Sequence, residues 1–124
     1  MEKIYTKNAP EAIGPYSQAV KVGNLVFTSG QIPINPENGN IEAVGIEAQP
    51  EQVMKNLSAV LSAAGSGCEY AIKTTCFLAE IADFGAFNEV YGKYFSSKPA
   101  RSCVAVKDLP KGVLVEVEVI AIAE

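Results

Sequence analysis

The sequence contains no histidine among its 124 residues. This absence excludes every Ser-His-Asp triad, Cys-His dyad and histidine-ligated metal site within one chain. Any catalysis would therefore depend on carboxylate, guanidinium, tyrosine, amide or backbone groups. Basic residues are also scarce: ten against fourteen acidic residues give a net charge of 10 − 14 = −4. This balance disfavours nucleic-acid binding, which normally requires a basic surface.

Cysteine and long apolar runs are scarce as well. The three cysteines, Cys68, Cys76 and Cys103, are odd in number and form no CxxC motif, so we expect no disulfide framework and no zinc site. Residues 1–7 lack the apolar core of a signal peptide, and no run reaches the roughly 18 apolar residues that span a bilayer. These features predict a cytoplasmic protein with no membrane partner.

The composition that remains is that of a folded chain. Hydrophobic residues make up 48% and charged residues 19%, whereas a disordered chain is poorer in apolar residues and richer in charge. No linker, repeat or low-complexity tract interrupts the sequence. We therefore expect a single domain over residues 1–124.

Hydrophobic periodicity and turn residues predict the secondary structure. Gly23-Asn24 suits a type II′ turn between two strands, and residues 33–45 form a loop, with a short strand near Ile41. Pro50 fits the first turn of a helix and Gly65 fits its end. The predicted elements are a hairpin of residues 17–22 and 25–29, a helix over 47–64, a strand over 70–79, a helix after the N-cap Asp83, and strands over 101–107 and 113–123.

This order favours an α+β fold with both helices on one face of the sheet, because two helices cannot cover both faces. The last strand alternates, with Val113, Val115, Val117, Val119 and Ala121 on one side and Leu114, Glu116, Glu118, Ile120 and Ile122 on the other. The second side is too apolar for open solvent. We expect another subunit to bury it, with the two glutamates in or near the interface.

Arg101, Cys103, Glu116 and Glu118 stand out on the last two strands. If these strands form a hairpin, Arg101 faces Glu118 and Cys103 faces Glu116, whereas a slip of one residue changes both pairs. One interpretation is a cross-strand ion pair beside a small core cysteine. The other is that Arg101 grips a ligand carboxylate and Glu116 acts as a general base. Cys103 is a weak candidate nucleophile, since no histidine can activate it.

Three further residues have weaker signals. Tyr16 follows the turn Gly14-Pro15 and is most simply a packing aromatic. Ser29 ends the second strand and could present its hydroxyl group. Asn88 interrupts the apolar stripe of the second helix. None of the three defines a site by itself.

Together these segments resemble the RidA family, also called YjgF/YER057c/UK114. The resemblance covers nearly the whole chain, and its most specific part is Pro99-Ala100-Arg101-Ser102-Cys103-Val104 with Val115-Glu116-Val117-Glu118. The other matching segments are Ala12-Ile13-Gly14-Pro15-Tyr16-Ser17-Gln18-Ala19, Phe27-Thr28-Ser29-Gly30-Gln31-Ile32-Pro33, Asn56-Leu57-Ser58-Ala59-Val60-Leu61 through Gly65, Phe87-Asn88-Glu89-Val90-Tyr91 and Leu109-Pro110.

The resemblance implies a chorismate-mutase-like fold: a single mixed sheet of about six strands with two helices on one face. It also implies a homotrimer with clefts between subunits. The implied reaction is hydrolysis of the 2-imino acids 2-iminobutanoate and 2-iminopropanoate, released by pyridoxal-phosphate dehydratases, to 2-oxo acids and ammonia. This reaction needs no cofactor and no metal.

The resemblance also implies roles for individual residues. Arg101 would clamp the substrate carboxylate, Glu116 would hold the attacking water, and the backbone of Cys103 would contact the ligand. Tyr16, Ser29 and Asn88 would complete the cleft, with Tyr16 approaching from a neighbouring subunit. Three alternatives stay open: a non-catalytic regulatory module that binds small carboxylates, an endoribonuclease or translation inhibitor, and a holdase-like chaperone.

Overall fold

The most apolar strand of the sequence lies in the middle of the sheet. The computed structural model describes residues 1–124 and contains one six-stranded sheet in the order β1-β2-β3-β6-β4-β5. All neighbouring strands are antiparallel except β4 and β5, which are parallel, so the sheet is mixed as predicted. The strands are β1 (Glu2–Ile4), β2 (Ala19–Val22), β3 (Leu25–Thr28), β4 (Ala71–Leu78), β5 (Ala100–Ala105) and β6 (Val115–Ile122).

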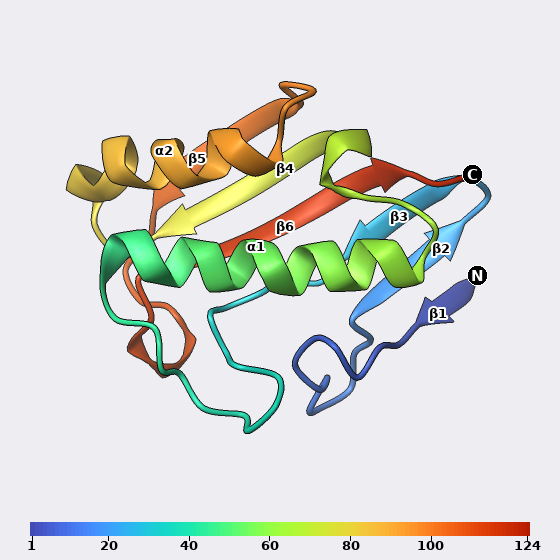
Figure 1. Ribbon diagram of the computed structural model, residues 1–124, viewed down its shortest axis with the longest axis horizontal. Coiled ribbons are helices and arrows are strands. Elements are labelled where there is room, and N and C mark those ends of the chain that lie inside the picture. The colour runs from blue at the N-terminus through green and yellow to red at the C-terminus, as the bar shows by residue number, and fades with distance from the viewer.

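Both helices, α1 (Gly45–Ala63) and α2 (Phe84–Tyr94), lie on the same face of this sheet (Figure 1). Short 3-10 turns cover Cys68–Tyr70, Ile81–Asp83 and Pro110–Gly112. Between helices and sheet lies a core of 23 buried residues, which includes Val115, Val117, Val119 and Ala121 of β6. The predicted alternation of this strand is therefore confirmed. Neither helix combines the length and the apolar character that crossing a bilayer requires.

Local sequence signals placed most element boundaries correctly. The hairpin pairs Val22 with Leu25, and Gly23 adopts a φ of 60° that its turn requires. At the end of α1, Gly65 has a φ of 80°, and the N–H of Ser66 donates to the carbonyl of Leu61 at 2.8 Å. This arrangement is the expected glycine-terminated helix end.

The start of α1 differs from the prediction. The helix begins at Gly45, two residues before the expected boundary, so Pro50 lies in its second turn and not in its first. A proline there donates no hydrogen bond to the carbonyl of Ile46, four residues earlier. Pro50 is nevertheless buried, so its packing offsets the missing bond.

The pairing of the last two strands is the main correction. β5 and β6 do not form a hairpin: β5 pairs with β4 in parallel, and β6 lies between β3 and β4. Arg101 is thus aligned with Thr74 and not with Glu118, and Cys103 is aligned with Cys76 and not with Glu116. The physical reason is burial, because a strand as apolar as β6 is best covered at the centre of the sheet. The less apolar β5 forms an edge.

One smaller prediction also fails, and one strand was not predicted. No strand forms near Ile41, where proline, asparagine and glycine residues keep the backbone in a loop. The edge strand β1 was not predicted, because it has only three residues and no periodicity to reveal it. It adds to β2 through the pair Ile4–Ala19.

The face of the sheet opposite the helices has no cover within the chain. It exposes apolar side chains from four strands, with 53% exposure at Val22, 37% at Phe27, 45% at Val104 and 41% at Ile122. Such a surface is typical of contacts between protein chains.

Candidate functional site

The Arg101 group lies between β5 and α2 and consists of Arg101, Phe84, Asn88, Tyr91 and Cys103. Arg101 is aligned with the fully buried Thr74, so its side chain points to the helix-covered face of the sheet. There its guanidinium carbon lies 4.7 Å from the ring centroid of Tyr91 and 5.3 Å from that of Phe84. One guanidinium nitrogen, Nη1, donates a hydrogen bond of 2.7 Å to Oδ1 of Asn88. The group thus joins Arg101 and Asn88, as the sequence analysis proposed for one site.

All these contacts are with neutral groups. Arg101 is the only arginine of the chain. The ion pair with Glu118, one of the two interpretations of the sequence, is absent because Glu118 is aligned with Thr75 on the other face of the sheet. Two aromatic faces and an amide oxygen hold the guanidinium in place without neutralising it. The arrangement keeps a fixed positive charge available for an anion.

The ring of Tyr91, which contacts this guanidinium, is itself held in place by other residues. Its hydroxyl forms a buried hydrogen bond of 2.7 Å with Oγ1 of Thr74, and its ring stacks on Phe95 at 4.5 Å between centroids. Phe84 and Tyr91 are not among the site residues predicted from the sequence. The signal that could have found them is helical spacing, because residues 84, 88 and 91 recur on one face of a helix.

Cys103 belongs to the same group, but its thiol is poorly suited to nucleophilic attack. Burial raises the pKa of Cys103, although the nearby charge of Arg101 acts in the opposite direction. The neighbouring Cys76 is more strongly affected, since burial raises its pKa to about 12. Thiols with raised pKa values carry little thiolate at neutral pH. The structure therefore favours the packing role for this side chain, which lies against the core.

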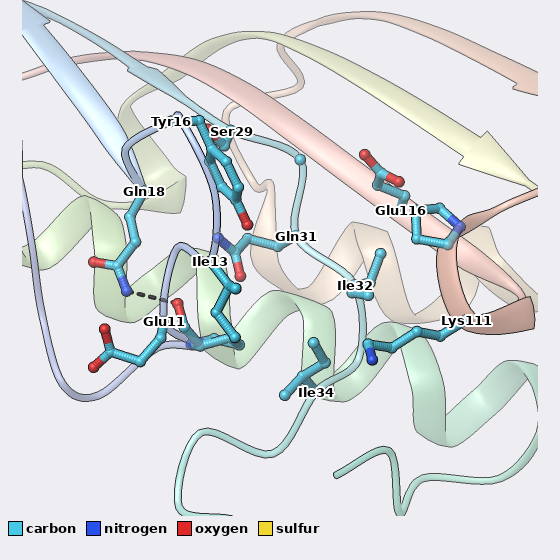
Figure 2. Close-up of a pocket in the computed structure, with 13 residues that line it drawn as sticks. Glu11, Ile13, Tyr16, Gln18, Ser29, Gln31, Ile32, Ile34, Lys111 and Glu116 are labelled. Atoms are coloured by element: carbon cyan, nitrogen blue, oxygen red, sulfur yellow. Dashed lines mark hydrogen bonds between the residues drawn. The ribbon is translucent and has the colours of Figure 1, made fainter. Parts of the chain in front are cut away.

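Glu116 lines a different cavity, a pocket of about 550 Å³. Figure 2 shows Tyr16 and Ser29 on one side of this pocket and Glu116 on the other, with Gln31 between them. Burial raises the pKa of the Glu116 carboxyl above its ordinary value, and the like charge of Glu118 raises it further. A carboxylate with a raised pKa accepts a proton more readily near neutral pH.

Ser29 and Gln18 fix the loop that carries Tyr16. The hydroxyl of Ser29 donates to the carbonyl of Ser17 at 2.6 Å, and its N–H donates to the carbonyl of Gln18 at 2.9 Å. The amide of Gln18 donates to the carbonyls of Thr6 and Pro10 at 3.0 and 2.7 Å. Gln18 is not among the predicted site residues, and its signal is a polar residue directly before the buried start of β2.

The Glu116 group, formed by Tyr16, Ser29 and Glu116, is separated from the Arg101 group by the sheet itself. Glu116 is aligned with Phe77 of β4, and Arg101 is aligned with Thr74 of the same strand. Residues three apart on a strand point to opposite faces. One chain therefore does not bring Arg101 and Glu116 together. No cluster of three His, Cys, Asp or Glu side chains that could hold a metal ion occurs in the chain.

These features define a small α+β protein with an unneutralised arginine on one face of its sheet and a partly buried glutamate of raised pKa on the other. A family model described as Endoribonuclease L-PSP matches residues 6–123. A candidate regulator, AldR of Lactococcus lactis, is 56% identical over 122 residues, covering 98% of this chain and 97% of the relative. The chain therefore belongs to the L-PSP family, known also as the RidA or YjgF family.

Solved structures agree with this assignment. A candidate endoribonuclease of Thermotoga maritima superposes with a TM-score of 0.96 at 48% identity, covering 100% of this chain and 98% of the other. TdcF of E. coli, solved with bound serine, gives a TM-score of 0.94 at 42% identity and full coverage of both chains, 100% each. The expected fold is therefore the fold of this family, and the roles of the individual site residues stay predictions.

Proposed function

We propose that this protein hydrolyses reactive 2-imino acids, such as 2-iminobutanoate and 2-iminopropanoate, to 2-oxo acids and ammonia. The observation that carries the proposal is the unneutralised guanidinium of Arg101, which neutral groups hold in place. A 2-imino acid has a carboxylate directly beside the electrophilic C=N carbon. A bidentate grip on that carboxylate therefore fixes the reacting carbon as well.

Glu116 supplies the second part of the reaction. Its carboxylate accepts a proton from water as the water oxygen forms a bond to the imine carbon. Glu116 returns this proton to the imine nitrogen, which gives a neutral carbinolamine. The carboxylate then takes the proton of the carbinolamine hydroxyl and passes it to the nitrogen, which leaves as ammonia as the C–N bond breaks and the C=O bond forms. A base with a raised pKa suits both steps, because it must accept and then return a proton near neutral pH.

We infer that a complete site needs two copies of the chain, because Arg101 and Glu116 lie on opposite faces of one sheet. In a homotrimer, Asn88 and Cys103 would accompany Arg101 from one copy, and Tyr16 and Ser29 would accompany Glu116 from the next. The uncovered apolar face of the sheet supports assembly, since Phe27, Val104 and Ile122 need a partner surface.

The direct test is release of ammonia or 2-oxo acid beside a threonine dehydratase. We expect Arg101→Ala and Glu116→Gln each to lower the catalysed rate by on the order of 10²-fold or more. Matched controls are Lys55→Ala, which removes an exposed cation from α1, and Glu2→Gln, which changes an exposed carboxylate in the edge strand β1. Equal rates for the wild type and Arg101→Ala would refute the proposal.

Mixing the two inactive variants tests the shared site. A chain with Arg101→Ala still carries Glu116, and a chain with Glu116→Gln still carries Arg101. Co-expression should therefore restore about one quarter of the wild-type rate by random pairing of neighbours. Absence of any recovery in mixed assemblies would show that each site belongs to a single chain.

The names of the relatives suggest two other functions, regulation and RNA cleavage, that the experiments should also test. The name of AldR describes a regulator, and the family model is described as an endoribonuclease. Binding of 2-oxobutanoate without faster imine hydrolysis would favour a regulatory module. RNA cleavage that disappears with Arg101→Ala would favour the nuclease. We further propose a cytoplasmic setting, with pyridoxal-phosphate dehydratases of serine or threonine as the source of substrate.

A further inference from the structure

We propose that Gly30 is a positioning residue for Glu116, because its missing side chain leaves the space in which the carboxylate lies. This inference rests on the proposed function only for its effect on turnover. The position of the carboxylate can be tested without any substrate.

Backbone pairing brings Gly30 against Glu116. Gly30 follows β3, and the next residue, Gln31, forms an isolated bridge with Val117. The N–H of Gln31 donates to the carbonyl of Val117 at 2.9 Å, and the N–H of Val117 donates to the carbonyl of Gln31 at 3.2 Å. Two hydrogen bonds thus fix the backbone beside Glu116, and Gly30 cannot easily move away.

The space at Gly30 is already filled by the glutamate side chain. A Cβ on residue 30 would lie 2.9 Å from Cδ and 3.0 Å from Cγ of Glu116, and it would overlap Oε2. These atoms are the flexible end of a long side chain. A methyl group at residue 30 would therefore displace the carboxylate, while the backbone keeps its paired position.

Displacement moves the carboxylate toward the open pocket. There it meets more water, so the burial that raises its pKa decreases. The other titratable groups that line this pocket are Glu11, Tyr16 and Lys111, and Glu118 lies next on the same face of β6. None of these groups is changed by a methyl group at residue 30.

The chain offers a matched control for this substitution. Gly85 lies in α2, adopts no positive φ, and has open space where a Cβ would stand. Gly85→Ala therefore adds the same methyl group without displacing a neighbour. Both variants are compared with the wild type at the same oligomeric state, checked by light scattering.

The test measures the Glu116 carboxyl directly by ¹³C NMR titration, assigned with Glu116→Gln. We expect Gly30→Ala to lower the pKa of Glu116 toward its ordinary value and to reduce kcat by about 10- to 100-fold. Binding of 2-oxobutanoate should change by less than about 3-fold, because Arg101 is untouched. Gly85→Ala should leave all three quantities unchanged.

A second background keeps the proposal falsifiable if Gly30→Ala folds poorly. In Glu116→Ala the space beside Gly30 is empty, so adding Gly30→Ala should change neither the melting temperature nor the residual rate. An equal loss in both backgrounds would overturn the proposal, and so would an unchanged titration of Glu116. If the wild type fails to hydrolyse imines, the proposed function fails, while the titration still decides the role of Gly30.

Discussion

The Arg101 group and the Glu116 group are built in different ways. Packed side chains hold Arg101, since Tyr91 and Phe84 face its guanidinium and Asn88 accepts its hydrogen bond. Backbone segments surround Glu116, since the turn after β3 and the loop before β2 form its pocket. The difference fits the two proposed roles, because a cation that is to bind an anion needs rigidity without neutralisation, whereas a base needs partial burial beside open space.

The largest expected effect comes from neutralising the Arg101 group. Asn88→Asp places a carboxylate where the guanidinium now meets a neutral oxygen, so an internal ion pair competes with the ligand. We expect binding of 2-oxobutanoate to weaken by about 10- to 100-fold, which corresponds to a charged hydrogen bond of roughly 1.5–3 kcal/mol. Calorimetric titration measures this change.

The control for Asn88→Asp is Asn24→Asp, which makes the same change of charge in the exposed hairpin turn. It should leave binding unchanged. If both variants weaken binding equally, net charge and not the local ion pair is responsible. An unaltered affinity in Asn88→Asp would show that neutrality around Arg101 has no functional value.

A smaller effect is expected from a substitution at Tyr91 that separates its buried hydrogen bond from the contact of its ring with Arg101. Tyr91→Phe keeps the ring under the guanidinium but removes the buried hydrogen bond to Thr74. We expect the free energy of unfolding to fall by about 1–3 kcal/mol, with turnover within about 3-fold of the wild type. Urea denaturation measures the first quantity. Tyr70→Phe, at an exposed tyrosine, should change stability by less than about 0.5 kcal/mol.

The smallest expected effect concerns the charge beside Glu116. Because its pKa is raised, the wild type should lose activity as the pH falls through that raised pKa, above the ordinary glutamate range. Glu118→Gln removes the second cause of the shift, so the acid limb of kcat/KM should move to lower pH. Burial remains the first cause, so the limb stays above the ordinary value. Glu2→Gln, in the edge strand β1, should leave the profile unchanged.

The same raised pKa has a consequence for stability. The folded protein disfavours the ionised form of Glu116 and so holds its proton more tightly than the unfolded chain does. The protonated carboxyl therefore contributes fully to the free energy of unfolding below the pKa of Glu116 in the unfolded chain. That contribution is lost as the pH rises through the folded pKa. Glu116→Gln should therefore flatten the stability profile across this window, which denaturation at several pH values can measure.

Much of the fold could be predicted from local sequence because its causes are local. Gly23 defines its turn, Gly65 ends α1, and the valines of β6 alternate along one strand. The partner of β5 could not be predicted in this way. Its pairing with β4 depends on the crossover through α2 between two parallel strands. Which strand occupies the centre of the sheet depends on all the strands together, so no short segment predicts it.

The candidate site shows the same limit. Residue type and resemblance singled out Arg101 and Glu116, and alternation placed each on a definite face of its own strand. The relation between those two faces depends on strand order, and the predicted hairpin of the last two strands, which put both residues on one face, is wrong because β4 lies between β5 and β6. Phe84 and Tyr91 were not predicted as site residues, because aromatic side chains on a helix are usually buried for packing alone.

Arg101 and Glu116 lie on opposite faces of one sheet, so under the proposed function the catalytic rate would depend on protein concentration. On the proposed assembly, an isolated chain holds halves of two different sites and a complete copy of neither. Catalysis per chain would then vanish on dilution below the dissociation constant of the assembly, although every chain stays folded. The rate at nanomolar protein would report subunit exchange, and substrate that bridges two copies would slow that exchange.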